Sequence, residues 1–375
     1  MTNQEIIQAV KKNPSNRVKI AFSDIDGILR GKYIAKEKFI AVVNNTTGFC
    51  DVIFGWDAAD QAYDAGRYTG WHTGYPDAEA RIDLSTFREI PWENNTPFFL
   101  GELIDDNGRP AYVCPRQLLK KVKADAAAMN FSLNASMEFE WYNFKETPQT
   151  AHVKQYRDLE PLTPGMFGYS VLRTAVNQPF FKALFEELDH FNVPLEGLHT
   201  ETGPGTFEAA IKYADLLEAG DRALLFKTAT KEIAYTQGIM ATFMAKINEM
   251  LPGCGGHIHQ SVWDRSGKKN LFADAKSKDG LSEVMRQYLA GQLYCLPYIL
   301  PMFAPTINSY KRLVEGAWAP TTLTWGIDNR TVALRVINSG ISSTRLETRV
   351  PGADVNPYLA MSAAIASGLY GIRKK

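Results

Sequence analysis

The sequence predicts an α+β protein built from two units, and three observations support this fold class. Strand-like segments separated by turns fill residues 16–104, and the pattern changes at Pro115. Beyond that residue, stretches with helical spacing of apolar residues alternate with strand-like stretches. The alternation lacks the regular period of a doubly wound parallel sheet. We therefore expect an N-terminal unit at residues 1–108 and a larger unit at residues 109–375.

The first unit begins with the pattern of a β-hairpin. Residues 17–23 alternate in polarity, Asp26 and Gly27 form a turn, and residues 28–34 resume the strand pattern. Two further segments complete the unit, a loop rich in Asp, Gly and aromatic residues and then a strand: residues 54–75 and 98–104.

The second unit combines helices and strands. A helix is expected from Pro115, because Leu119 and Val122 lie at helical spacing behind a proline in the first position. Asn356 and Pro357 supply the N-cap and the first-turn proline of a later helix. The remaining expected helices are 177–191, 216–235, 282–296 and 356–372. The expected strand-like stretches are 132–144, 194–211, 253–264, 321–337 and 344–350.

Composition narrows the class of protein. The 375 residues include 45% hydrophobic and 22% charged side chains, which indicates a folded chain with a sizeable core. Lys plus Arg and Asp plus Glu both number 41, so the net charge is zero. A neutral chain offers no general electrostatic attraction to nucleic acid or to a membrane surface, and we expect neither as a partner.

The cysteines and the apolar stretches predict a cytoplasmic protein. The four cysteines are widely spaced, which favours neither a zinc knuckle nor a disulfide framework. Residues 1–12 are polar and contain no stretch suited to a signal peptide. The longest apolar stretch, residues 296–304, is short and contains Pro297 and Pro301, so no membrane span is expected.

Ionisable side chains recur at positions i and i+2 of strand-like segments, where they share one face of the strand. Glu138 and Glu140 form one such pair, and His257 and His259 form another. A third segment places Glu347 between two arginines. A fourth acidic pair, Glu201 and Glu208, flanks a Gly/Pro turn.

Glu138 and Glu140 have apolar and aromatic neighbours, so neither face of their strand is plainly exposed. Like carboxylates repel in a low-dielectric site unless a cation neutralises them. The strand alone leaves a surface pair and a metal site open. Together with Glu201, Glu208 and Glu347, the pair favours a site for Mg²⁺ or Mn²⁺ with oxygen ligands.

Five arginines concentrate in apolar segments between residues 312 and 349: Arg312, Arg330, Arg335, Arg345 and Arg349. Structural salt bridges to core acids would explain any one of them. Arginine also binds phosphate and carboxylate in a bidentate manner. Five arginines beside candidate metal ligands favour phosphoryl-transfer chemistry, in which cations offset the developing negative charge.

The order of these motifs resembles that of glutamine synthetase over residues 16–372. The matching segments are Met137-Glu-Phe-Glu140, Glu201-Thr-Gly-Pro-Gly-Thr-Phe-Glu208, Gly253-Cys-Gly-Gly-His-Ile-His-Gln-Ser261, Asn308-Ser-Tyr-Lys-Arg-Leu313, Asp328-Asn-Arg330, Arg345-Leu-Glu-Thr-Arg349 and Asn356-Pro-Tyr-Leu-Ala. The resemblance implies an N-terminal β-grasp domain and a catalytic domain with an antiparallel sheet flanked by helices. It also implies rings of identical subunits with active sites between neighbours.

The resemblance assigns roles to individual residues. Two metal ions (Mg²⁺ or Mn²⁺) are implied, one held by Glu140, Glu201 and Glu208 and the other by Glu138, His257 and Glu347. Gly253, Arg312 and Arg349 resemble the residues that bind glutamate. The positions expected near ATP and its phosphates are Arg330, Arg335, Arg345, Tyr213, Ser261 and His199. Asp57 resembles the acid that accepts ammonium across a subunit boundary.

The implied reaction has two steps. ATP phosphorylates the γ-carboxylate of glutamate, and an amine or ammonia then displaces phosphate to form a γ-amide. An ionised acidic side chain must take a proton from the attacking nitrogen.

Trp318 departs from the family pattern. It stands just before Ala319-Pro320, where glutamine synthetases place a catalytic glutamate. An aromatic side chain there resembles the branch that joins glutamate to larger amines or polyamines, because it offers apolar surface to an alkyl group. The alternatives are a glutamine synthetase that uses ammonia and a non-catalytic structural or regulatory relative in which the bulky residue fills the entrance.

The family also usually continues beyond the Asn356-Pro357 helix into a helical tail that supports ring assembly. The sequence ends at Lys375, so we expect that tail to be lacking, and a natural short form, the product of a split gene and a fragment are the alternatives.

Overall fold

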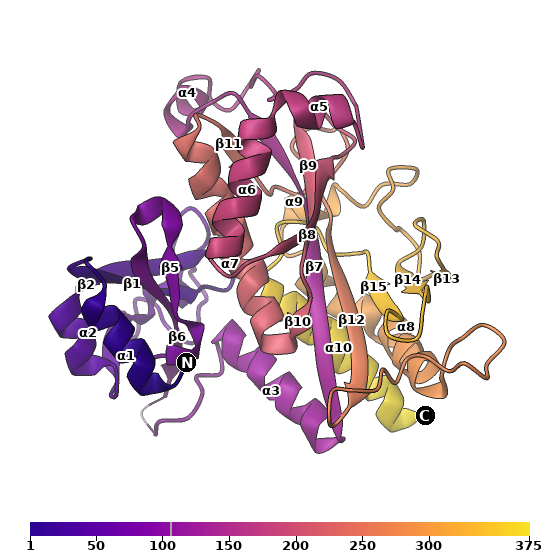
Figure 1. Ribbon diagram of the computed structural model, residues 1–375, viewed down its shortest axis with the longest axis horizontal. Helices are drawn as coiled ribbons and strands as arrows, with labels where there is room; N and C mark the ends of the chain where they lie inside the picture. Colours follow the sequence, from indigo (N-terminus) through magenta and orange to yellow (C-terminus); the bar gives the residue numbers. More distant parts are fainter. Residues whose placement is uncertain (106) are drawn as a thin grey trace.

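The computed structural model describes residues 1–105 and 107–375 and contains two β-sheets, each with its own helices (Figure 1). The smaller, N-terminal sheet lies to one side of α7 (Leu216–Thr236), and the larger sheet lies to the other side. None of the helices in the described ranges has both the length and the apolar character needed to cross a membrane.

The N-terminal sheet has six strands in the order β2-β1-β6-β4-β3, with β5 paired to β6. Its strands are β1 (Arg17–Ser23), β2 (Leu29–Ala35), β3 (Thr47–Cys50), β4 (Asp77–Ile82), β5 (Arg88–Ile90) and β6 (Thr96–Ile104). The accompanying helices are α1 (Asn3–Lys12), α2 (Lys36–Val42) and the short 3-10 turns η1 (Asp51–Phe54), η2 (Leu84–Thr86) and η3 (Pro91–Glu93). The predicted hairpin is confirmed, since β1 and β2 pair antiparallel, whereas β1 and β6 run parallel.

The larger sheet has nine strands in the order β13-β14-β15-β12-β7-β9-β8, with β10 and β11 also paired to β7. The strands are β7 (Phe131–Phe144), β8 (Leu195–Thr200), β9 (Thr206–Ile211), β10 (Ala214–Asp215), β11 (Met240–Thr242), β12 (Gly256–Asp264), β13 (Trp325–Ile327), β14 (Leu334–Ile337) and β15 (Arg345–Thr348). All pairings are antiparallel except that of β13 with β14. The expected antiparallel sheet is therefore confirmed, with one parallel pair at its edge.

The helices of the larger unit are α3 (Pro115–Ala128), α4 (Pro148–Val153), α5 (Val171–Val176), α6 (Gln178–His190), α7, α8 (Glu283–Phe303), α9 (Ile307–Tyr310) and α10 (Pro357–Lys374). Asn356 caps α10 as predicted, because its side chain accepts hydrogen bonds from the amides of Tyr358 and Leu359. The helix expected at 282–296 was wrong in extent, because α8 continues past both of its prolines to Phe303. The strand-like stretches expected at 194–211 and 321–337 each contain two short strands.

Two apolar clusters form the core. The smaller one joins the N-terminal sheet to α1 and α2 and also includes Ala111 and Cys114. The larger one joins β7, α7 and α10 and also includes Ala21, Ile90 and Phe98 from the N-terminal sheet. The N-terminal sheet therefore packs on the larger unit through one of its faces. The division between residues 108 and 109 stays a prediction.

Buried ionic contacts also connect the two units. Arg116 of α3 donates two hydrogen bonds of 2.8 Å to Asp221 of α7 and contacts Asp83 and Glu102 from the N-terminal unit. Breaking one partner of such a buried group is costly, so this cluster holds the two units in one arrangement.

Candidate active site

Strand pairing brings distant side chains to the centre of the larger sheet. β7 carries Glu138 opposite His257 of β12, and Glu140 opposite Glu208 of β9. In the adjoining strands Glu347 of β15 pairs with His259. Because alternate residues of a strand share a face, this register gathers acids and imidazoles on one side of the sheet.

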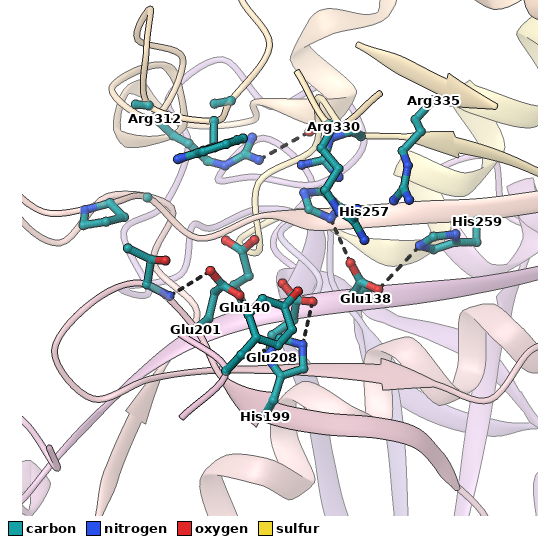
Figure 2. A pocket seen from close by; sticks show the side chains of 18 of the residues that line it. Glu138, Glu140, His199, Glu201, Glu208, His257, His259, Arg312, Arg330 and Arg335 are labelled. Atoms are coloured by element: carbon teal, nitrogen blue, oxygen red, sulfur yellow. Dashed lines mark hydrogen bonds and ion pairs between the residues drawn. The ribbon is translucent and has the colours of Figure 1, made fainter. Parts of the chain in front are cut away.

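All of these side chains except that of Glu347 line a cavity of about 710 Å³. Figure 2 shows the labelled acids and His199 along one side and Arg312, Arg330 and Arg335 along the other. The predicted site residues that line this cavity are Glu138, Glu140, His199, Glu201, Glu208, Gly253, His257, Arg312, Arg330, Arg335, Arg345 and Arg349. The structure thus brings together most of the residues singled out from the sequence.

One metal-competent cluster contains Glu138, His259 and Glu347, with possible ligand atoms all within 4.8 Å of one another. His257 also contacts this cluster, since its Nδ1 lies 3.2 Å from Glu138 and 3.5 Å from Glu347. Burial opposes ionisation of Glu138, but the hydrogen bond with His257 and the nearby His259 imidazole, 3.7 Å away, hold its pKa well below the usual value. Burial also opposes ionisation of Glu347, while the nearby His259, His257 and Arg349 lower its pKa overall.

The second cluster contains His199, Glu201 and Glu208, with the same spacing between possible ligand atoms. His199 Nε2 lies 3.2 Å from Glu208, and its Nδ1 lies 3.8 Å from Glu201. Burial raises the pKa of Glu208 to about 8; the negative charges of Glu138 and Glu140 add to this effect, and the hydrogen bond with His199 opposes it. The pKa of His199 is raised despite burial, because Glu208 favours the charged imidazole.

The clusters overlap with the predicted ligand sets without matching them member for member. Glu140 lines the cavity, but its Oε2 accepts a hydrogen bond of 2.6 Å from the amide of Gly255. His259 joins Glu138 and Glu347 although the prediction named His257. Carboxylate oxygens with one imidazole suit Mg²⁺ or Mn²⁺, so the donor chemistry of both clusters fits the predicted ions.

Several arginines of the site form hydrogen bonds or ion pairs with other residues of the protein. Arg335 donates to Glu347 at 3.0 Å and also to Asp328, and Arg349 forms an ion pair with Glu347. Arg312 donates to the carbonyls of Val350 and Arg349. The Nε of Arg349 is buried without a hydrogen-bond partner among the described residues, which suits an arginine that receives an anionic ligand.

Four predicted site residues are not part of the cavity lining. Glu347 is fully buried beneath the cavity lining. Tyr213 and Ser261 line a neighbouring cavity of about 370 Å³, which shares Glu138, His259 and Arg345 with the main cavity. Asp57 lies in the N-terminal unit, where its carboxylate accepts hydrogen bonds from the amides of Ala59 and Gln61.

The sequence reasoning missed Tyr169 and underrated His259. The Tyr169 ring stacks on His199 with ring centroids 4.2 Å apart, in a loop segment with no regular pattern to mark it. His259 shares the strand face of His257, so the alternation signalled it. Arg345 Nε donates to His259 Nδ1 at 3.3 Å, which leaves Nε2 to face Glu138.

Trp318 lies at the opening of the cavity. Its backbone has a φ of 61°, and its side chain lines the cavity while the residue is 69% exposed. A positive φ is unusual for a bulky residue, so the local turn fixes this backbone against its preference. The cavity therefore presents an aromatic surface next to Ala317 and Ala319.

The site combines two acidic clusters on one side of a cavity with arginines on the other. Residues 112–375 match the family model described as "Glutamine synthetase, catalytic domain". "Type-1 glutamine synthetase 2" from Dictyostelium discoideum is 56% identical over 99% of this chain and 71% of its own length. "Glutamate--isopropylamine ligase" from a Pseudomonas species is 37% identical over 98% of this chain and 80% of its own length.

A solved structure gives the same result for the fold. The "GmaS/ADP complex" superposes with a TM-score of 0.83 at 28% identity and covers 98% of this chain and 81% of its own. The chain belongs to the glutamine synthetase family of ligases. Enzymes of this family use ATP and divalent metal ions.

Proposed function

We propose that the chain is an ATP-dependent ligase that joins the γ-carboxylate of glutamate to a small organic amine. The observation that carries the choice of donor is Trp318, an exposed aromatic side chain on the cavity lining. Its ring offers apolar surface to an alkyl group, whereas ammonium would gain nothing from it. The relative from Pseudomonas, named for isopropylamine, supports the same choice.

The arginines have two roles in this proposal. Arg312, Arg349 and the backbone at Gly253 bind glutamate, and the unpartnered Nε of Arg349 is available for its carboxylate. Arg330, Arg335 and Arg345 face the transferred phosphoryl group, where fixed positive charge stabilises the transition state. His199 is positioned near that group through its contact with Glu208.

Two divalent ions fit the acidic clusters. Glu140, Glu201 and Glu208 would hold one ion, and Glu138, His257 and Glu347 would hold the other, with His259 close enough to replace or supplement His257. The ions would offset the negative charge of ATP and of the transferred phosphoryl group. Tyr213 and Ser261, in the cavity that adjoins through Glu138, would contact the rest of the nucleotide.

The reaction proceeds in two balanced steps. An oxygen of the glutamate γ-carboxylate attacks the terminal phosphorus of ATP, and ADP leaves. The amine nitrogen then attacks the acyl carbon, phosphate leaves, and a proton passes from nitrogen to an ionised carboxylate. Asp57 is our candidate for that carboxylate, supplied by a neighbouring subunit of a ring, since within one chain it lies outside the cavity.

A second donor, ammonia, is favoured by one observation. The relative with 56% identity carries the name of a glutamine synthetase. We expect either activity in the cytoplasm, where ATP and glutamate are abundant and the free cysteines stay reduced.

The test is phosphate release from ATP with Mg²⁺ or Mn²⁺ and glutamate, comparing ammonia with methylamine, isopropylamine and ethanolamine. Mass spectrometry of the same reactions identifies the amide. We expect turnover with an alkylamine and little with ammonia. Turnover with ammonia alone would favour the second candidate, and no turnover with any donor would favour a non-catalytic relative.

The variant Trp318→Glu tests the role of the aromatic side chain. We expect the ratio of kcat/KM for alkylamine over ammonia to fall by at least about tenfold, because the apolar contact is lost and a carboxylate is gained. Trp325→Glu is the matched control, since Trp325 is also partly exposed but does not line the cavity. An unchanged ratio in Trp318→Glu would contradict the proposed donor.

A further inference from the structure

A separate cavity lies between the N-terminal sheet and α7. It has a volume of about 200 Å³ and is lined by β1, β2, β5, β6, the turn at Trp92, Phe191 and one face of α7. Figure 1 shows α7 between the two sheets, so this cavity is on the opposite side of that helix from β7. It shares no lining residue with the active-site cavity.

The floor of this inter-unit cavity is apolar. Ile90 and Phe98 of the N-terminal sheet, Phe191, and Leu225 and Ala229 of α7 contribute side chains to its lining. A cavity of about 150 Å³ lined by similar side chains can hold benzene. The inter-unit cavity therefore has room for a branched aliphatic or a benzyl group.

The charged groups that line the cavity have both signs: they are Lys19, Lys32 and Glu232. The ammonium of Lys19 lies 2.5 Å from Glu93 and 3.3 Å from Glu232. Trp92 Nε1 donates to the other oxygen of Glu232 at 2.8 Å, and Tyr33 donates to Glu93. An ammonium has three donors and a carboxylate can accept about four hydrogen bonds, so Lys19 and Glu232 both keep capacity for a ligand.

We propose that the inter-unit cavity binds an apolar α-amino acid such as leucine or phenylalanine. The ligand's carboxylate would accept from Lys19 and its ammonium would donate to Glu232, two groups that stand next to each other as the two charges of an amino acid do. The side chain would fill the apolar floor. A ligand with a single charge would form an ion pair with only one of these two side chains.

Such a ligand would touch elements that support the active site. Lys19 lies on β1 and Glu232 on α7, so the ligand would bridge the two units. Leu225 is followed on α7 by Phe226, whose ring lies 5.8 Å from that of Phe139, between the predicted ligands Glu138 and Glu140 on β7. The inference is independent of the proposed donor, because it rests on different residues.

The experiment is calorimetric titration and thermal shift of the full chain with leucine and phenylalanine in saturating glutamate, which keeps the active site from contributing. We expect saturable binding that Lys19→Met and Ala229→Phe each weaken by about tenfold or more, through loss of a charged hydrogen bond or of space. Lys145→Met is the matched control, because Lys145 forms an exposed ion pair with Glu160 and does not line the cavity.

3-Methylbutylamine and 4-methylpentanoate, which each keep the side chain and one charge of leucine, should bind at least about tenfold more weakly than leucine. The proposal would be overturned if no saturable binding occurred up to the solubility of the amino acids. It would also be overturned if Lys19→Met and Ala229→Phe bound the amino acids as tightly as the wild type does, or if glutamate displaced them. Each variant is first shown to melt cooperatively, and if Ala229→Phe does not fold, the Lys19→Met comparison decides alone.

Discussion

The two acidic clusters of the active-site cavity have the same kinds of side chain but different electrostatic surroundings. Around Glu347, Arg335 and Arg349 form ion pairs with the carboxylate, His257 and His259 lie close by, and the pKa values of Glu138 and Glu347 are lowered. Around Glu208, His199 is the only cationic side chain in an ion pair among the described residues, and the pKa of Glu208 is raised to about 8.

This difference shows that clusters with the same types of ligand can differ in how easily their carboxylates ionise to bind a metal ion. The first cluster is neutralised by the protein itself, so its carboxylates are ionised before any ion arrives. The second cluster must lose protons or gain a cation to hold its acids ionised. Without a metal ion, we expect repulsion between ionised carboxylates to destabilise the second cluster, whereas the charges of the first cluster are already compensated.

Glu347→Gln should produce the largest effect. Glu347 is fully buried and contacts both Arg335 and Arg349, so the variant leaves two buried guanidinium groups without their shared counter-charge. Breaking a buried ion pair in this way costs about 3 kcal/mol or more. Urea unfolding in the presence of a chelator, followed by tryptophan fluorescence, should show a large loss of stability at neutral pH.

The control for Glu347→Gln is Glu160→Gln, which removes an exposed carboxylate from an ion pair with Lys145. A loss for Glu347→Gln no greater than that for the control would show that the arginines do not depend on this acid. The contrast between the two clusters would then have no basis in stability.

Glu208→Gln should change the free energy of unfolding by a smaller amount and should stabilise the protein relative to the wild type, again with a chelator present. The folded-state pKa of about 8 lies above the ordinary value of 4.5 for a glutamate, so the native state binds more protons between these two pH values. Wild-type stability therefore falls as the pH rises through this window. The variant lacks this titration, and its relative stability should increase from pH 5 to pH 9 by an amount on the order of 2 kcal/mol.

Melting temperatures of both proteins across that pH range provide the measurement. Adding Mn²⁺ should reverse the order, because an ion bound to the native state stabilises the wild type and the variant lacks a ligand. Parallel pH profiles without metal would contradict the raised pKa of Glu208. An equal rise with Mn²⁺ in both proteins would show that Glu208 is not a ligand.

The clusters also show which parts of the site could be predicted from the sequence. The alternation of Glu138 and Glu140 in an apolar strand predicted a shared face, and the register of β7 with β9 and β12 then set their neighbours. Alternation alone does not say which of His257 and His259 lies closer to a given acid, because both point to the same face. That choice depends on hydrogen bonds such as the one from Arg345 to His259.

Other features depended on contacts that no local pattern contains. α8 continues past Pro297 and Pro301, although proline disfavours a helix interior, and its later residue Phe303 is buried in the larger core. Tyr169 lies near His199 because its loop is hydrogen-bonded to Thr200 at the end of β8. Tertiary packing decided these positions, and helical or strand spacing could not reveal them.

Asp328→Asn should have the smallest effect and sharpens the contrast within the first cluster. Asp328 and Glu347 both accept from Arg335, but the Asp328 side chain is 68% exposed and Glu347 is buried. Hydrogen bonding to Arg335 lowers the pKa of Asp328, yet water solvates both partners when the contact is lost. We expect no measurable change in melting temperature and a modest change in the KM for ATP, since Arg335 keeps its buried partner. A stability loss similar to that of Glu347→Gln would show that the exposed acid, and not burial, holds this arginine in place.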